Sequence, residues 1–305
     1  MRERKYQAQA IEFALDRLRS DGRSLIQLPT GSGKTLVSLR AAAIWLQRPR
    51  ARVYLVTPSE ETVRQTEITA RMLGMRPALD IPGASQKPSH YAPFVVTTYA
   101  SAWRRFQRWT GSQTLLILDE CHHVNFLAPV NADILNQFEF GLGLSATPWS
   151  KGCLAYFKNH KHTYKLSQAI ADGVNAPYVI NEWADPVSGN YQMIYTNNRD
   201  YREAITRSLK SCDYAIYTKP LAREVIAKFR CGAIRTIVVN RMLTEGFDLP
   251  KVKRIWIMRD TKSRIAVMQM AGRALRAFQS RTAEIYVQSP LARTLLKHAL
   301  ERAES

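Results

Sequence analysis

The sequence predicts an α/β protein of two domains, each with a mostly parallel sheet flanked by helices. Three observations lead to this fold class. The chain has 305 residues, which suits two domains better than one. Short apolar runs typical of buried strands recur along it, and runs with the apolar spacing of helices alternate with them. Such alternation is typical of right-handed βαβ units.

In the first half, the pattern predicts a domain over residues 1–150. Helices are expected at Tyr6–Arg19, Lys34–Leu46 and Glu60–Leu73. Strands are expected at Ser24–Leu28, Arg52–Thr57, Phe94–Thr98, Thr114–Leu118 and Gly141–Ser145.

A segment rich in proline and glycine, with few strand-like runs, is expected to connect the domains over 151–189. A second domain is then predicted over 190–305. Its strands are expected at Tyr191–Thr196, Tyr214–Thr218, Thr236–Asn240, Arg254–Met258 and Glu284–Gln288. Its helices are expected at Asp200–Leu209, Pro220–Phe229, Ile265–Arg276 and Pro290–Arg302.

The formal net charge of +19 is concentrated in the second half. Residues 1–150 hold 18 basic and 12 acidic residues, a balance of +6, and residues 151–305 hold 26 and 13, a balance of +13. A basic domain favours a polyanionic partner, because neutralising phosphates releases counterions. A merely solvated basic surface remains the alternative.

The chain is expected to stay in the cytoplasm. It has no apolar run of about 18 residues and begins with a charged stretch, unlike a secretory signal. Its four cysteines form no C-x-x-C pair, so free thiols are expected rather than zinc ligands or disulfides.

A glycine-rich loop between a predicted strand and a predicted helix indicates a nucleotide site. Gly31-Ser32-Gly33-Lys34-Thr35 would turn backbone N–H groups toward phosphate oxygens at a helix N-terminus. Lys34 would reach the β- and γ-phosphates of ATP, and Thr35 would bind Mg²⁺. The strict P-loop pattern fails only at its first position, which is Leu28.

An acidic pair follows the predicted strand Thr114–Leu118. Asp119 is placed to organise Mg²⁺, and Glu120 to take a proton from the attacking water. Alone, two carboxylates after a strand would be ordinary surface residues. Following a phosphate loop, they favour ATP hydrolysis. His123 is interpreted as a bystander.

Taken in order, these segments resemble a superfamily 2 helicase of the DExH kind, with two RecA-like domains and an ATP cleft between them. The resemblance covers most of the chain and includes the non-glycine residue before the loop. Its motifs correspond here to Arg4-x-Tyr6-Gln7, Leu28–Thr35, Val56–Pro58, Thr97–Ser101, Asp119–His122, Ser145–Pro148, Leu243–Val252 and Gln269–Arg276. Met270 departs from the last motif, where an arginine is common.

The resemblance implies a role for each matching residue. Nucleotide contacts are expected from Arg4, Gln7, Pro29, Thr30, Gly31, Ser32, Gly33, Lys34, Thr35, Gly246 and Asp248. Catalysis is expected from Lys34, Glu120, Gln269 and the candidate arginine fingers Arg273 and Arg276. Coupling of hydrolysis to movement is expected from His122, Ser145 and Thr147.

Contacts to nucleic acid are expected mainly along the sugar–phosphate backbone. The candidates are Thr57, Pro58, Thr97, Thr98, Arg104, Arg105, Arg241 and Thr244. The segment Ser101–Trp109 interleaves arginines with aromatics. It could stack bases, but a helix with core aromatics and solvated arginines is the favoured reading.

The expected function is that of a monomeric ATP-dependent helicase or translocase that moves on or remodels single-stranded or branched DNA. RNA as the substrate and a motor subunit of a restriction or defence complex remain alternatives, so a protein partner is conceivable. A nucleic-acid-binding protein with an inactive ATP site is disfavoured. Only about 20 residues, Leu249–Met268, lie between Asp248 of the second-last motif and Gln269, where the last motif begins. This economy suggests a weak unwinder of the compact phage or bacterial type, in the host cytoplasm if phage-encoded.

Overall fold

The computed structural model describes residues 3–82, 84, 88–89, 91–111, 113–196, 203, 209, 213–217, 221–239, 249, 251–259, 261–276 and 281–305. The chain forms two compact units. The first comprises Met1–Leu28 and Gly33–Tyr164, and the second comprises Pro29–Ser32 and Lys165–Ser305. The division between Tyr164 and Lys165 falls inside the segment predicted as a connector.

The first unit is built on a seven-stranded sheet in the order β3-β4-β2-β5-β6-β1-β7, with every paired neighbour parallel. The strands are β1 (Arg23–Gln27), β2 (Arg52–Thr57), β3 (Ala78–Asp80), β4 (Phe94–Thr98), β5 (Thr114–Asp119), β6 (Phe140–Ser145) and β7 (Lys161–Thr163). The central strands are apolar runs because helices bury both faces of a parallel sheet. The predicted α/β fold class is therefore confirmed.

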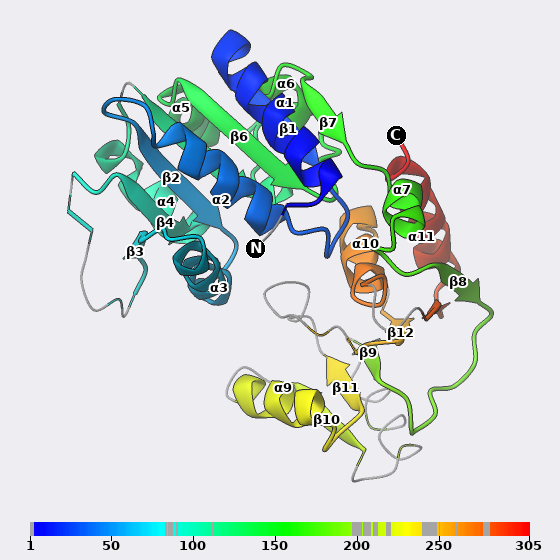
Figure 1. Ribbon diagram of the computed structural model, residues 1–305. Helices are drawn as coiled ribbons and strands as arrows, with labels where there is room; N and C mark the ends of the chain where they lie inside the picture. Colours follow the sequence, from blue (N-terminus) through cyan, green and yellow to red (C-terminus); the bar gives the residue numbers. More distant parts are fainter. Residues whose placement is uncertain are drawn as a thin grey trace. The chain divides into compact units, whose positions relative to one another are not determined.

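Helices cover this sheet, and Figure 1 shows α1 and α2 lying across it. They are α1 (Lys5–Asp21), α2 (Lys34–Trp45), α3 (Glu60–Met72), α4 (Tyr99–Arg105), α5 (Pro129–Asn136) and α6 (Lys151–Tyr156), with short 3₁₀ turns η1 (Phe106–Arg108) and η2 (Cys121–His123). Local chemistry sets several ends. Ser59 caps α3, Ser150 caps α6, and Gly22 ends α1 in the left-handed conformation.

One face of the sheet packs against α4, α5 and the end of α6. Tyr54 of β2 stacks near Trp109 and Phe138, and Phe157 lies in the same buried cluster. Gly143 of β6 lies beneath Phe157, where an added Cβ would lie 2.5 Å from the ring. A larger residue at this position of the strand would therefore displace the aromatic core.

The second unit holds a six-stranded parallel sheet in the order β10-β11-β9-β12-β13-β8. Its strands are β8 (Tyr178–Asn181), β9 (Gln192–Thr196), β10 (Tyr214–Tyr217), β11 (Thr236–Val239), β12 (Arg254–Met258) and β13 (Ala283–Val287). Its described helices are α7 (Leu166–Ala171), α9 (Ala222–Cys231), α10 (Arg264–Gly272) and α11 (Pro290–Arg302). The predicted helix Asp200–Leu209 lies almost wholly outside the described residues.

An ion cluster joins two strands of this second sheet. Glu284 of β13 pairs with Lys253 at 2.8 Å and with Arg254 at 2.7 Å. Burial acts to raise the pKa of Glu284, but the hydrogen bonds and charges of these two cations outweigh it and hold the pKa below its ordinary value.

Two segments of the predicted connector are strands. Lys161–Thr163 pairs with β1, and Tyr178–Asn181 pairs with β13. Both are short edge strands and largely half-exposed, so they lack the apolar runs that reveal the central strands. Within the part of the chain that the structure describes, no helix is long and apolar enough to cross a membrane.

Candidate functional site

The phosphate loop leads from β1 into α2, as predicted. Gly33 immediately precedes the helix in the left-handed conformation, with φ of 84°. An added Cβ there would lie 2.6 Å from the side-chain nitrogen of Gln7. Within the loop, the Ser32 hydroxyl donates to the Pro29 carbonyl at 2.7 Å. The loop therefore requires glycine at position 33 and presents the first N–H groups of α2 to an anion.

Lys34 begins α2 and pairs with the acidic residue predicted as the base. Its Nζ lies 3.1 Å from Oε1 of Glu120, and its side chain is only 8% exposed. Glu120 has φ of 51°, an unusual value for a residue with a Cβ. The turn after β5 thus directs this carboxylate toward the start of α2.

Asp119 ends β5 and is buried, and its Oδ1 accepts a hydrogen bond from the Glu120 N–H at 3.1 Å. Thr35 lies in the first turn of α2. A carboxylate and a hydroxyl are hard oxygen donors of the kind that Mg²⁺ prefers. Thr35 and Asp119 are therefore of the residue types that can bind a magnesium ion.

A hydrogen-bonded chain links the ends of β5 and β6, which are neighbours in the sheet. His122 Nδ1 lies 2.8 Å from Ser145 Oγ, and the buried Thr147 N–H donates to the same hydroxyl at 2.9 Å. His122 also lies 3.4 Å from Oε2 of Glu120. The three residues predicted to couple hydrolysis to movement are thus in direct contact.

Cys121, between Glu120 and His122, belongs to the core. Its Sγ lies 3.8 Å from Sγ of Cys153, and both thiols are buried. Burial raises the pKa of the Cys121 thiol well above its ordinary value, and Cys153 raises it further. Cys121, Cys153 and Cys231 are free thiols, as predicted, and Cys212 lies outside the described residues.

The upstream element lies at the start of α1. Gln7 is buried, and its Oε1 accepts a hydrogen bond from the Arg4 N–H at 3.0 Å. Tyr6 stacks on Tyr164 with ring centroids 4.1 Å apart. Gln7 is therefore held beside Gly33 of the phosphate loop, whereas the side chain of Arg4 is exposed.

Three of the predicted nucleic-acid contacts have hydroxyls engaged within the first unit. Thr57 accepts from the Thr62 hydroxyl at 2.9 Å, and Thr97 donates to the Asp80 carbonyl at 2.6 Å. Thr98 caps α4. In this conformation these hydroxyls stabilise the ends of β2 and β4. That they contact nucleic acid stays a prediction.

The basic candidates differ in exposure. Arg104 is exposed on α4, whereas Arg105 forms an ion pair with the buried Asp80. Pro58 is half-exposed after β2. Arg241, Thr244, Gly246 and Asp248 lie outside the described residues.

The aromatics of Ser101–Trp109 mostly face the core, the favoured alternative of the sequence analysis. Trp109 is buried and Phe106 half-buried, while Arg104 and Arg108 are exposed. Trp103 is half-buried, packs against the same core cluster as Trp109, and also lines a surface cavity.

In the second unit, the candidate fingers lie at the end of α10 and just after it. Arg273 is only 3% exposed, and Arg276 forms a β-bridge with Asn175. Burial raises the pKa of Tyr195 on β9 to about 12, while the charges of Arg273 and Arg276 act to lower it. The positive charges of both guanidinium groups therefore act on the side chain of Tyr195, near the end of β9. Gln269 lies on α10, partly exposed.

A contact that reaches the acidic pair was not predicted from the sequence. Tyr99 begins α4, and its hydroxyl donates to the backbone carbonyl of Asp119 at 2.8 Å. Its position directly after a predicted strand is the signal that could have identified it, because the carboxyl ends of parallel strands share one edge of the sheet.

The fold and this site together define a protein with two RecA-like domains, the first of which carries a phosphate loop of the nucleotide-binding type. The chain belongs to the superfamily 2 helicases, as two family matches show. Residues 1–150 match the family described as "Type III restriction enzyme, res subunit". Residues 188–278 match the family described as "Helicase conserved C-terminal domain".

Two relatives by sequence carry helicase or translocase names. The chain is 32% identical over 149 residues to the DNA 3'-5' translocase XPB2 of Sulfurisphaera tokodaii, covering 48% of this chain and 30% of that protein. It is 23% identical over 171 residues to the ATP-dependent DNA helicase uvsW of Enterobacteria phage T4, covering 52% and 34%. The matches thus span about a third of each relative's length.

A solved structure supports the fold. A fragment of a putative HsdR subunit of a type I restriction enzyme from Vibrio vulnificus YJ016 matches with a TM-score of 0.75 and 20% identity. The match covers 96% of this chain and 65% of that one.

Proposed function

We propose that the chain is a nucleic-acid-dependent ATPase that uses hydrolysis to move on DNA or to remodel branched DNA. The observation that carries this proposal is the pairing of Lys34 with Glu120 beside the His122–Ser145 hydrogen bond. One edge of the sheet thus holds an amine that can bind phosphate, a carboxylate that can act as a general base, and a hydrogen bond to the neighbouring strand β6. ATP hydrolysis that drives movement requires these three features.

Each residue has a defined task in this reaction. Lys34 binds the β- and γ-phosphates and leaves its ion pair with Glu120, which then takes the proton of the attacking water. Arg273 and Arg276 are proposed to neutralise the charge that develops on the transferred phosphoryl group. Thr35 and Asp119 would hold Mg²⁺, which neutralises charge on the phosphate oxygens.

Movement is proposed to follow from loss of the γ-phosphate. When phosphate leaves, Glu120 can pair again with Lys34, and His122 senses the change through its 3.4 Å contact to Glu120. His122 transmits it to Ser145 and Thr147, which lie at the end of β6. A domain held by the phosphate is then released, which is the usual way that hydrolysis drives such switches.

DNA is favoured over RNA as the nucleic acid on which the chain moves. The two relatives are named as a DNA translocase and a DNA helicase. The net charge of +19 suits either polyanion, so the names of the relatives decide the preference. We propose a monomer that remodels or anneals branched DNA and unwinds only short duplexes.

A second candidate is a motor subunit of a larger restriction or defence complex. The family description of residues 1–150 and the similarity in fold to an HsdR fragment favour it. The ATPase chemistry would be the same, but the chain would act within an assembly.

The test is the rate of phosphate release with single-stranded DNA, duplex DNA, forked DNA and RNA. We expect stimulation by DNA, greatest with the fork, and a loss of about 100-fold or more in Lys34→Ala, because an electrostatic contact to the reacting phosphate is removed. Equal rates in the wild type and Lys34→Ala would refute the mechanism. The mass of the native assembly distinguishes a lone motor from a subunit.

A further inference from the structure

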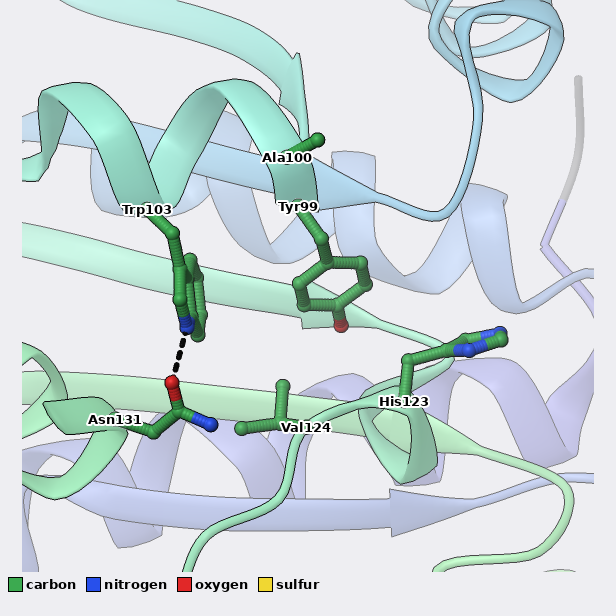
Figure 2. A pocket seen from close by; sticks show the side chains of 6 residues that line it. All are labelled: Tyr99, Ala100, Trp103, His123, Val124 and Asn131. Atoms are coloured by element: carbon green, nitrogen blue, oxygen red, sulfur yellow. Dashed lines mark hydrogen bonds between the residues drawn. The ribbon is translucent and has the colours of Figure 1, made fainter. Parts of the chain in front are cut away.

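A small cavity in the first unit lies between the start of α4 and the segment after β5. Tyr99, Ala100 and Trp103 form one wall, and His123, Val124 and Asn131 form the other. Figure 2 shows Tyr99 and Trp103 extending from α4 toward the other three side chains. Its volume of about 260 Å³ lies just below the range for drug-sized ligands, so it suits one small planar group.

The walls of this cavity are aromatic and preorganised. The Tyr99 and Trp103 rings lie 5.6 Å apart at 72°, and the Tyr99 and His123 rings lie 6.1 Å apart at 47°. Trp103 Nε1 donates to Oδ1 of Asn131 at 2.5 Å, as drawn in Figure 2, and the Asn131 amide donates to the Asn125 carbonyl at 2.9 Å. Because these polar groups are already paired, the cavity offers flat apolar faces rather than a pattern of donors and acceptors.

The position of the cavity favours a nucleic-acid strand as the source of that planar group. Tyr99 follows β4 and His123 follows β5, so the cavity lies at the carboxyl edge of the sheet, as do Asp119 and the phosphate loop. Two exposed arginines, Arg104 and Arg108, follow Trp103 in the same segment and can attract phosphates.

We propose that this cavity accepts one unstacked nucleobase of the bound strand, held by stacking on Trp103 and His123 without reading its identity. The proposal rests on the proposed function, since it assumes a nucleic-acid track. Every base has a π-face, so stacking tolerates all sequences while adding affinity. A seated base would also contact Tyr99, whose hydroxyl holds the Asp119 carbonyl beside the ATP site.

The test compares binding of two strands of equal length, an oligothymidylate and a strand in which every base is replaced by an abasic site. Both strands make the same backbone contacts. The dissociation constant of the abasic strand divided by that of the oligothymidylate therefore isolates the contribution of the bases. Losing one stacked base should reduce this ratio by about tenfold. We expect that loss in Trp103→Leu, which fills the space without a ring, and a smaller loss in His123→Ala.

Two variants serve as controls. Trp103→Phe keeps an aromatic face and should retain most of the preference for bases. Val130→Ala changes an exposed residue of α5 that does not line the cavity, so it should keep the wild-type ratio. His123 is exposed, so its variant tests the proposal even if a change at Trp103 disturbs folding.

The outcomes separate this proposal from the proposed function. A wild-type preference for bases that persists in both Trp103→Leu and His123→Ala would overturn the base site and favour an aromatic side chain of a protein partner as the occupant. If the wild type binds neither strand and no nucleic acid stimulates its ATPase, the proposed function fails, and this inference fails with it.

Discussion

Replacing Ser145 with alanine removes the hydroxyl that joins His122 to the segment after β6. In the structure, this hydroxyl accepts a hydrogen bond from the buried Thr147 N–H and lies 2.8 Å from His122 Nδ1. A buried amide that loses its partner costs about 1–3 kcal/mol, and a second lost hydrogen bond costs about 1 kcal/mol more. We therefore expect Ser145→Ala to lower the free energy of unfolding of the first unit by about 2–4 kcal/mol.

A matched control exists in the same sheet. Ser24 of β1 is equally buried, but its hydroxyl has no hydrogen-bond partner among the residues that the structure describes. Ser24→Ala removes the same atom without stranding a partner, so it should change stability by less than about 0.5 kcal/mol or increase it. Urea unfolding of both variants measures the difference, and equal effects of the two changes would refute the reasoning.

The Ser145 variant should also change function. If the His122–Ser145 bond transmits the state of the ATP site, Ser145→Ala should reduce the stimulation of ATP hydrolysis by DNA more than it reduces basal hydrolysis. An unchanged ratio of stimulated to basal rate would mean that the bond is only structural.

Three further outcomes are expected. Gly33→Ala should lower stability by about 1–2 kcal/mol, measured by urea unfolding, because alanine disfavours φ of 84° and its Cβ would meet Gln7. The ionised Glu284 should stabilise the second unit at pH values above about 4.3, the pKa of this carboxyl in the unfolded chain, because its pKa is lower in the folded protein. This contribution should be lost as the pH falls through the folded pKa. If the urea midpoint of Glu284→Gln depends on pH as strongly as that of the wild type, this expectation is wrong. In a thiol-reagent time course on the native protein, Cys231 should react at once and Cys121 only after unfolding, so early modification of Cys121 would be evidence against its burial.

The central strands were predictable because burial on both faces makes each one a continuous apolar run. Arg52–Thr57, Phe94–Thr98 and Arg254–Met258 occur over the residues that the sequence predicts. Three edge strands, β3, β7 and β8, were missed, whereas the edge strand β10 was predicted as Tyr214–Thr218. An edge strand is short and half-exposed, and its pairing depends on a neighbour that is distant in the sequence.

The candidate site was predictable where chemistry requires particular residues next to one another along the chain. The phosphate loop and the acidic pair are of this kind. The pairing of Lys34 with Glu120 and of Tyr99 with the Asp119 carbonyl could not be read from the sequence, because both depend on which strands are neighbours. The burial of Thr57 and Thr97 also depends on tertiary packing, which residue type does not reveal.

The pairing of β7 with β1 determines where the first unit can be cut. β1 lies between β6 and β7, so a polypeptide ending at residue 150 would leave one side of the phosphate-loop strand with unpaired N–H and C=O groups. Such an edge is a template for association with other chains. It would also lack Tyr164, on which Tyr6 stacks. An isolated first domain should therefore remain monomeric when it ends after Tyr164 and aggregate when it ends at 150, a difference that light scattering would reveal.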